Sequence, residues 1–166
     1  MTATATLPNA RFLVAHPAHF VALGFGSGLA PFAPGTFGML VAIPLALLLR
    51  HYGGDGLFAA AIVVAFAAGA WAAQITGSDL GVPDHGSIVI DEVAAFLLVL
   101  FFVGVDDPLR IAVAFALFRV FDIVKPPPIR QLDAAYKNGV GVMADDLLAA
   151  LYALAVFALL QRLMGG

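Results

Sequence analysis

Residues 57–75 read L-F-A-A-A-I-V-V-A-F-A-A-G-A-W-A-A-Q-I and contain no charged side chain. At 1.5 Å per residue, a helix of this length is about long enough to cross the ~30 Å hydrocarbon core of a bilayer. The stretch therefore predicts a membrane-spanning helix, and the rest of the chain is interpreted outward from it.

Further apolar segments lie on both sides of this stretch, although each alone is also consistent with a buried helix of a soluble protein. Together, in a chain of 166 residues with brief linkers, they predict an all-α protein, a small polytopic membrane helical bundle. We expect a single domain over 1–166, with an N-terminal tail over 1–18. The further predicted spans are Phe37–Leu49, Ile88–Val105, Leu109–Val124 and Leu147–Leu163.

The composition supports a membrane protein, because 62% of the residues are apolar and only 11% are charged. Soluble domains average roughly 45–50% apolar and about 25% charged residues. The absence of cysteine excludes a disulfide scaffold and a thiolate nucleophile. With 8 Lys and Arg and no basic run, the chain is not expected to bind nucleic acid. The sequence leaves the oligomeric state open.

Five spans would place the N-terminal region, 76–87 and 125–146 on one side of the membrane. The loops 50–56 and 106–108 and the C-terminus would lie on the other. The basic residues slightly favour a cytoplasmic location for the first side. Nearly every polar residue that needs an explanation lies on that first side.

The first polar segment is G-F-G-S-G-L-A-P-F-A-P-G-T at 24–36, which predicts a re-entrant Gly/Pro-rich loop. Glycine lets backbone N–H groups approach an anion closely, and a helix N-terminus favours phosphate. We expect Thr36 to cap the following helix, and we expect Ser27, Gly28, Gly35 and Thr36 to contact phosphate. The alternative is a turn or a close helix crossing without a ligand.

The second segment is D-H-G-S-I-V-I-D-E at 84–92, in which Asp91 and Glu92 open an apolar helix. Carboxylates inside a membrane segment are costly and usually face the bundle or a water-filled cavity. A charge pair that favours the helix dipole is the alternative explanation. Asp84 and His85 are accessory candidates, with His85 as a proton carrier.

The third segment is F-R-V-F-D-I-V-K-P-P-P-I at 118–129. Arg119 and Asp122 lie on one helix face, so their simplest use is a mutual ion pair. The prolines end the helix near Lys125, whose ammonium group is suited to an anionic ligand.

The fourth segment is G-V-G-V-M-A-D-D at 139–146, and an N-cap role is the simplest explanation for Asp145 or Asp146 alone. Together with Asp91, Glu92 and Asp122 they make five carboxylates at one end of a small bundle. Their mutual repulsion implies a bound cation, and oxygen ligands favour Mg²⁺ before Mn²⁺. We expect the carboxylates of residues 91, 122 and 145 to converge.

The four segments together resemble the bacterial phosphatidylglycerophosphatase A family of lipid phosphatases, over about residues 19–153. The resemblance implies Mg²⁺-dependent hydrolysis of phosphatidylglycerophosphate to phosphatidylglycerol and phosphate. It also implies a multi-pass protein of the bacterial cytoplasmic (inner) membrane among membrane lipids, with its active site facing the cytoplasm. The family's charged motif positions fall on Asp84, Asp91, Glu92, Arg119, Asp122, Lys125, Asp145 and Asp146.

For the mechanism, water activated by metal is the preferred nucleophile, because no cysteine is present. Asp91, Glu92, Asp122, Asp145 and Asp146 would supply one or two Mg²⁺ sites and a base, and Arg119 and Lys125 would hold phosphate oxygens. Which acid is the base stays open. One alternative is a small cation- or proton-coupled membrane transporter, because acids within broken membrane helices are also typical of transporters. A structural membrane subunit is another, although it leaves the five acids unexplained.

Overall fold

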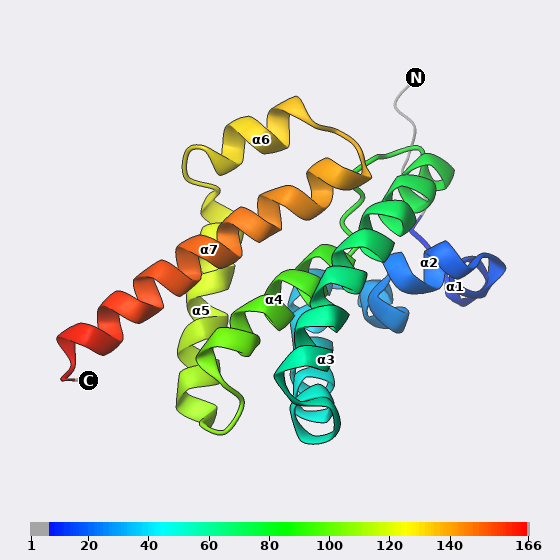
Figure 1. The fold of residues 1–166 in the computed structure, drawn as a ribbon. Helices are drawn as coiled ribbons and strands as arrows, with labels where there is room; N and C mark the ends of the chain where they lie inside the picture. The colour runs from blue at the N-terminus through cyan, green and yellow to red at the C-terminus, as the bar shows by residue number, and fades with distance from the viewer. Residues whose placement is uncertain (1–6, 166) are drawn as a thin grey trace.

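The computed structural model describes residues 7–165, and within that range every regular element is helical (Figure 1). The predicted all-α class is therefore confirmed. The elements are α1 (Ala10–Ala15), α2 (Pro17–Ala22), the 3₁₀ helix η1 (Gly24–Leu29), α3 (Pro34–Leu80), α4 (Ile90–Val103), α5 (Pro108–Val124), α6 (Ile129–Ala135) and α7 (Gly139–Leu163).

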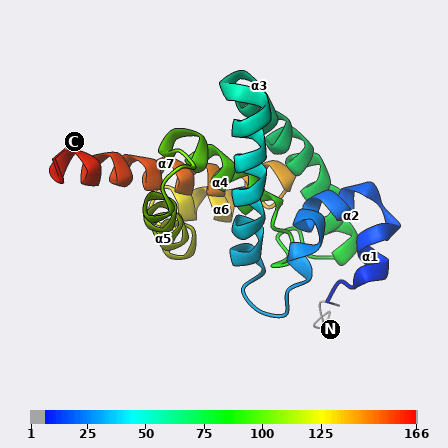
Figure 2. The ribbon, with the colours of Figure 1, turned by 90° about the horizontal axis from the view of Figure 1, so that it is seen from below.

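The predicted spans 37–49 and 57–75 are two arms of α3, which meet at Gly54. Gly54 has φ 59° and ψ −171°, a conformation that residues with a Cβ atom avoid. The arms diverge from this point as an inverted V in Figure 2. The predicted loop 50–56 is thus reduced to a sharp turn, the Gly54 turn. By length and composition, α3 and α7 are apolar enough to cross a membrane.

The start of α7 differs from the prediction, because the helix begins at Gly139 rather than Leu147. The Asn138 side chain caps it by accepting a hydrogen bond from the N–H of Gly141 at 2.9 Å. Asp145 and Asp146 therefore lie inside the helix and are not its N-cap. The N-cap explanation for these two acids is wrong.

The central element is α4, which contacts both arms of α3 as well as α5 and α7. Ten of its 14 residues are buried, including Phe96 and Leu100 at its middle. Small residues such as Ala94 and Ala95 let the neighbouring helices approach closely. Because α4 is enclosed along its length, the acids in its first turn are enclosed as well.

The predicted N-terminal tail, 1–18, is helical from Ala10 onward, while residues 1–6 lie outside the described residues. The buried His19 attaches α2 to the end of α3. Its Nδ1 lies 2.8 Å from the carbonyl oxygen of Phe12, and its Nε2 lies 2.7 Å from Asp79 Oδ2. These contacts hold the N-terminal helices beside the following glycine-rich segment.

The elements place the polar segments together, as Figure 1 shows. The start of α7 and the short helix α6 lie toward one end of the molecule. The Gly54 turn and the connection between α4 and α5 lie toward the other end. These two groups correspond to the two sides predicted from the sequence. We call the first the site end and the second the far end.

Candidate active site

Three carboxylates converge at the site end. Asp91 and Glu92 come from the first turn of α4, and Asp146 comes from α7. Each carboxylate contributes one oxygen atom to this cluster, and these three oxygen atoms all lie within 4.8 Å of one another. We call this set the carboxylate triad. It contains three of the five carboxylates predicted as metal ligands. Asp122 and Asp145, which we expected to converge with Asp91, are not part of it.

Each carboxylate of the triad has a buried oxygen without a hydrogen-bond partner among the described residues. These oxygens are Asp91 Oδ1, Glu92 Oε2 and Asp146 Oδ2. Asp91 is only 8% exposed and Asp146 only 3%. Buried carboxylates without partners are costly, and a cation bound between these converging oxygens would be a common partner for all three.

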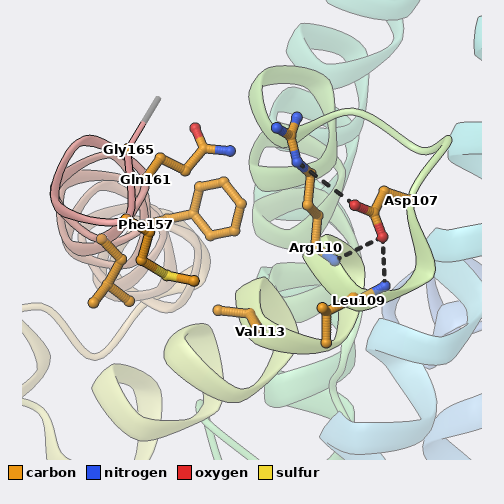
Figure 3. Close-up of a pocket in the computed structure, with 9 residues that line it drawn as sticks. Asp107, Leu109, Arg110, Val113, Phe157, Gln161 and Gly165 are labelled. Atoms are coloured by element: carbon orange, nitrogen blue, oxygen red, sulfur yellow. Dashed lines mark hydrogen bonds and ion pairs between the residues drawn. The ribbon is translucent and has the colours of Figure 1, made fainter.

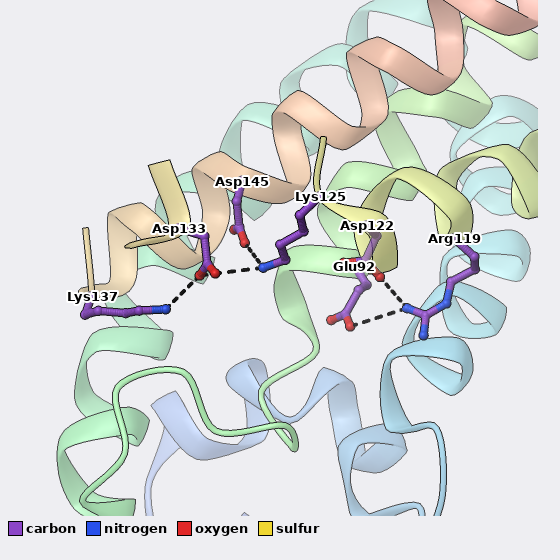
Figure 4. A network of polar contacts seen from close by, with 7 residues as sticks. All are labelled: Glu92, Arg119, Asp122, Lys125, Asp133, Lys137 and Asp145. Atoms are coloured by element: carbon purple, nitrogen blue, oxygen red, sulfur yellow. Dashed lines mark hydrogen bonds and ion pairs between the residues drawn. The ribbon is translucent and has the colours of Figure 1, made fainter. Parts of the chain in front are cut away.

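Asp122 lies in the last turn of α5 and pairs with Arg119, at 2.5 Å between Oδ2 and Nη1. The ion pair that we considered as an alternative is therefore present. The same Arg119 nitrogen also lies 3.9 Å from Glu92 Oε1, so the guanidinium group joins this pair to the carboxylate triad (Figure 4).

Lys125 follows the last residue of α5 and does not extend freely from the membrane edge. Its Nζ donates a hydrogen bond to Asp145 Oδ2 and lies 3.6 Å from Asp133 Oδ1 of α6. Asp133 in turn accepts a hydrogen bond from Lys137 at 2.8 Å. These four side chains form a continuous charged chain from α7 to α6 (Figure 4).

The charges of this chain stabilise one another. Burial alone would lower the pKa of Lys125, but the hydrogen bond to Asp145 and the charge of that carboxylate raise it above its ordinary value. The hydrogen bond from Lys137 lowers the pKa of Asp133, and the charge of Lys125 acts in the same direction. Lys125 and Asp133 are therefore both charged at neutral pH.

The glycine-rich segment contributes one close contact to this site. A Cβ atom on Gly35, at the start of α3, would collide with the Glu92 carboxylate and would lie 3.2 Å from Arg119 Nη1. The N–H of Gly35 belongs to the first helical turn, where N–H groups have no partner within the helix. Gly35 is thus placed where an anion beside Arg119 can meet a helix N-terminus.

The other predicted phosphate contacts of this segment make local interactions instead. Ser27 Oγ donates to the carbonyl of Gly24 at 2.9 Å, and the N–H of Gly28 donates to the carbonyl of Leu23 at 2.9 Å. A Cβ atom on Gly28 would collide with the carbonyl oxygen of Ser87, so this glycine permits a close approach of two backbone segments.

Thr36 is not the N-cap of α3. That position belongs to Ala33, with Pro34 as the first helical residue, and the N–H of Thr36 donates to the carbonyl of Ala33 at 2.9 Å. The helix starts early because proline is well suited to a first helical position, where no N–H is required.

The two accessory candidates differ in exposure. His85 is buried, and its Nδ1 accepts a hydrogen bond from the N–H of Ser87 at 3.1 Å. Neutral His85 therefore carries its proton on Nε2. Asp84, its neighbour, is exposed.

The sequence interpretation missed Asp133 and Lys137, which complete the charged chain around Lys125. Their spacing of four residues is the usual signal for a helical ion pair. That signal indicates a helix where the structure has α6, but it does not reveal the contact with Lys125.

A separate cavity of about 530 Å³ lies at the far end, between the start of α5 and the end of α7 (Figure 3). Phe157 and Val113 form apolar parts of its lining, and Arg110 and Asp107 lie at its edge. Because the carboxylate triad is not part of its lining, this cavity is distinct from the candidate active site.

The fold and the site together define a class: a helical protein with membrane-compatible helices that gathers buried carboxylates, an arginine and a lysine at one end. The family model for phosphatidylglycerophosphatase A matches residues 20–161. The chain belongs to the phosphatidylglycerophosphatase A family.

Individual relatives agree with this assignment. Phosphatidylglycerophosphatase A of Haemophilus influenzae is 43% identical over 157 residues, which cover 95% of this chain and 96% of that protein. The Escherichia coli protein of the same name is 38% identical over 141 residues, 85% of this chain and 81% of its own. A Bacteroides thetaiotaomicron protein provisionally named a phosphatidylinositol-3-phosphatase is 40% identical over 151 residues, 87% of this chain and 94% of its own. No solved structure matches the chain.

Proposed function

We propose that this protein is a lipid phosphatase that hydrolyses phosphatidylglycerophosphate to phosphatidylglycerol and inorganic phosphate. Family membership over residues 20–161 and relatives of the same name support the substrate. The Bacteroides relative is named for a different lipid. The two named lipids have the same chemistry, a phosphate monoester on a polyol that a phosphodiester joins to diacylglycerol.

The observation that carries this proposal is the carboxylate triad with its unpartnered buried oxygens. The donor set contains only oxygen, which suits a hard divalent cation such as Mg²⁺. Asp91, Glu92 and Asp146 would hold the ion, and the nearby Asp145 and Asp122 would stay with Lys125 and Arg119. A bound Mg²⁺ would neutralise charge on the phosphate and activate a water molecule for attack.

The other site residues act directly on the phosphate. Arg119 presents a planar set of N–H donors to phosphate oxygens, and the N–H of Gly35 adds a donor at a helix N-terminus. His85 is close in sequence to the triad and has one ring nitrogen available to carry a proton to the leaving group. These residues bind and orient the monoester where the charge develops during hydrolysis.

We further propose that the protein is a multi-pass bundle of the bacterial inner membrane with the site end facing the cytoplasm. The two long apolar helices support membrane insertion. Lys125, Arg130 and Lys137 lie in the segment at the site end, in agreement with the tendency of basic residues to stay cytoplasmic. Residues 24–33 would form a loop that re-enters the membrane surface beside α4.

The test is phosphate release from phosphatidylglycerophosphate by the detergent-solubilised protein, with Mg²⁺ and with a chelator. We expect release that requires Mg²⁺ and returns when the ion is restored. A protein that releases no phosphate under either condition, but moves protons or cations across proteoliposome membranes, would instead be a transporter.

A further inference from the structure

Two cationic side chains, one on α5 and one just after its last residue, occupy separate positions at the site. Arg119 and Lys125 are six residues apart, so their backbones are about 9 Å apart along the helix axis. In the view of Figure 4, Glu92 and Asp122 lie between them. Each cation also has its own carboxylate partners. This arrangement favours two anionic groups on the ligand over a single phosphate shared by both cations.

The surroundings of Arg119 are those of the reacting phosphate. Its Nη1 lies 3.9 Å from Glu92 Oε1, and Glu92 belongs to the carboxylate triad. The start of α3 approaches the same guanidinium group at Gly35. A phosphate bound here would therefore lie next to both the proposed Mg²⁺ ligands and a helix N-terminus.

The surroundings of Lys125 are different. Its partners are Asp145, with which it shares a hydrogen bond, and Asp133, at 3.6 Å. Neither residue belongs to the carboxylate triad, and Asp133 lies on the short helix α6. The Lys125 side chain is 25% exposed, so part of it is accessible to solvent at the rim of the site.

We propose that Arg119 binds the phosphate monoester that is hydrolysed and that Lys125 binds the phosphodiester that joins the headgroup to diacylglycerol. The inference rests on the proposed function, because it concerns the same substrate. It assigns the enzyme's selectivity to lipids that carry both phosphates. Asp133, held in turn by Lys137, is the positioning residue that keeps the Lys125 ammonium at the rim.

The two reaction products allow the binding roles of Arg119 and Lys125 to be tested separately. Phosphatidylglycerol keeps the phosphodiester and lacks the monoester, whereas inorganic phosphate represents the monoester alone. Equilibrium binding of each product is measured in Mg²⁺-containing buffer, with phosphatidylglycerol presented in phosphatidylcholine micelles. We expect Lys125→Gln to weaken phosphatidylglycerol binding about tenfold and to change phosphate binding less than about twofold. Arg119→Gln should do the reverse.

Four further variants make the result specific. Arg130→Gln removes an exposed cation from α6 and should leave both affinities unchanged. Lys125→Arg keeps the charge and should restore most of the phosphatidylglycerol affinity if Lys125→Gln has not disturbed the fold. Asp133→Asn should weaken phosphatidylglycerol binding alone, and Asp133→Glu should restore it.

An equal loss of affinity for both products in Lys125→Gln would overturn the inference. A reversed pattern, in which Lys125→Gln weakens only phosphate binding, would overturn it as well. Both results would leave phosphatidylglycerophosphate hydrolysis by the unaltered protein intact. Absence of that hydrolysis would count against the proposed function instead.

Discussion

The two ends of the molecule use charge in different ways. At the far end, Asp107 caps α5 by accepting from the N–H of Leu109 at 2.8 Å. Arg50 pairs with Asp55 and donates to the carbonyl of Phe101 at 2.9 Å. At the site end, the carboxylate triad keeps buried oxygens without partners among the described residues.

The difference separates structural charges from functional ones. A charge whose partners are complete within the fold can be explained by folding alone, because burial is compensated. The triad is compensated only in part, by Arg119 at 3.9 Å from Glu92 Oε1, so its unpartnered oxygens need a ligand to explain their cost. Substitutions at the two ends of the molecule test this distinction.

The largest effect is expected for Asp91→Asn or Asp146→Asn. Each removes a charged ligand from the triad while keeping the side-chain size, so phosphate release should fall on the order of 10³-fold. Binding of Mg²⁺ should raise the Tm of the unaltered protein, and this rise should be absent in both variants. Asp106→Asn, at an exposed far-end position, is the control and should retain both. Full activity in both triad variants would show that the triad does not hold a catalytic ion.

A smaller loss of activity is expected for Gly35→Ala. The added Cβ atom would lie 2.8 Å from Glu92 Cδ, so the carboxylate and Arg119 must shift, with a loss of about 10–100-fold in kcat/KM. Gly56→Ala is the matched control, since its Cβ atom would meet nothing within 4 Å among the described residues. Equal kinetics in the two variants would contradict the close packing of α3 on the site.

At the far end, stability should change instead of activity. Arg50→Met loses the hydrogen bond to Phe101 and the stacking of the guanidinium group 5.4 Å from the Phe58 ring centroid. We expect unfolding to become easier by about 1–3 kcal/mol, with kcat/KM within about twofold. Thermal unfolding in detergent measures the first quantity. The exposed Arg162→Met should change neither, and a large loss of activity in Arg50→Met would break the comparison.

The smallest effect is expected for Asp107→Ala, which removes the cap of α5. Loss of one N-cap costs about 1 kcal/mol, so Tm should fall slightly while hydrolysis stays normal. Its neighbour Asp106 makes no cap of α5, and Asp106→Ala should leave Tm unchanged. Equal Tm values for the two variants would mean that the cap contributes nothing measurable.

The apolar pattern predicted the long helices α3, α4, α5 and α7, because membrane-length apolar runs have few alternatives to helix. It placed α4 and α5 within two residues of their ends. It failed where polar residues decide a boundary, as at Asn138, whose cap extends α7 toward its N-terminus. It also missed α1, α2 and α6, because short helices of six or seven residues have too weak a periodic signal.

The candidate site was predicted as a set of residues but not as an arrangement. Adjacent acids in a helix point about 100° apart, so the sequence does not say which of Asp145 and Asp146 faces Asp91. The structure directs Asp146 to the triad and Asp145 to Lys125. That choice depends on how α7 is rotated against α4 and α5, which is a matter of packing.

The amino-acid sequence is enough to predict a helical membrane-type protein with its charge concentrated at one end, and its motifs identify the family. Those properties follow from composition, from periodicity and from order along the chain. The tertiary structure brings Asp91, Glu92 and Asp146 together and pairs Asp122 with Arg119 and Asp145 with Lys125. It also leaves one buried oxygen of Asp145, Oδ1, without a hydrogen-bond partner among the described residues, as it does for each acid of the triad. The physical reason is that ion pairing and metal affinity depend on distances of a few ångströms between different helices, which no spacing along one helix specifies.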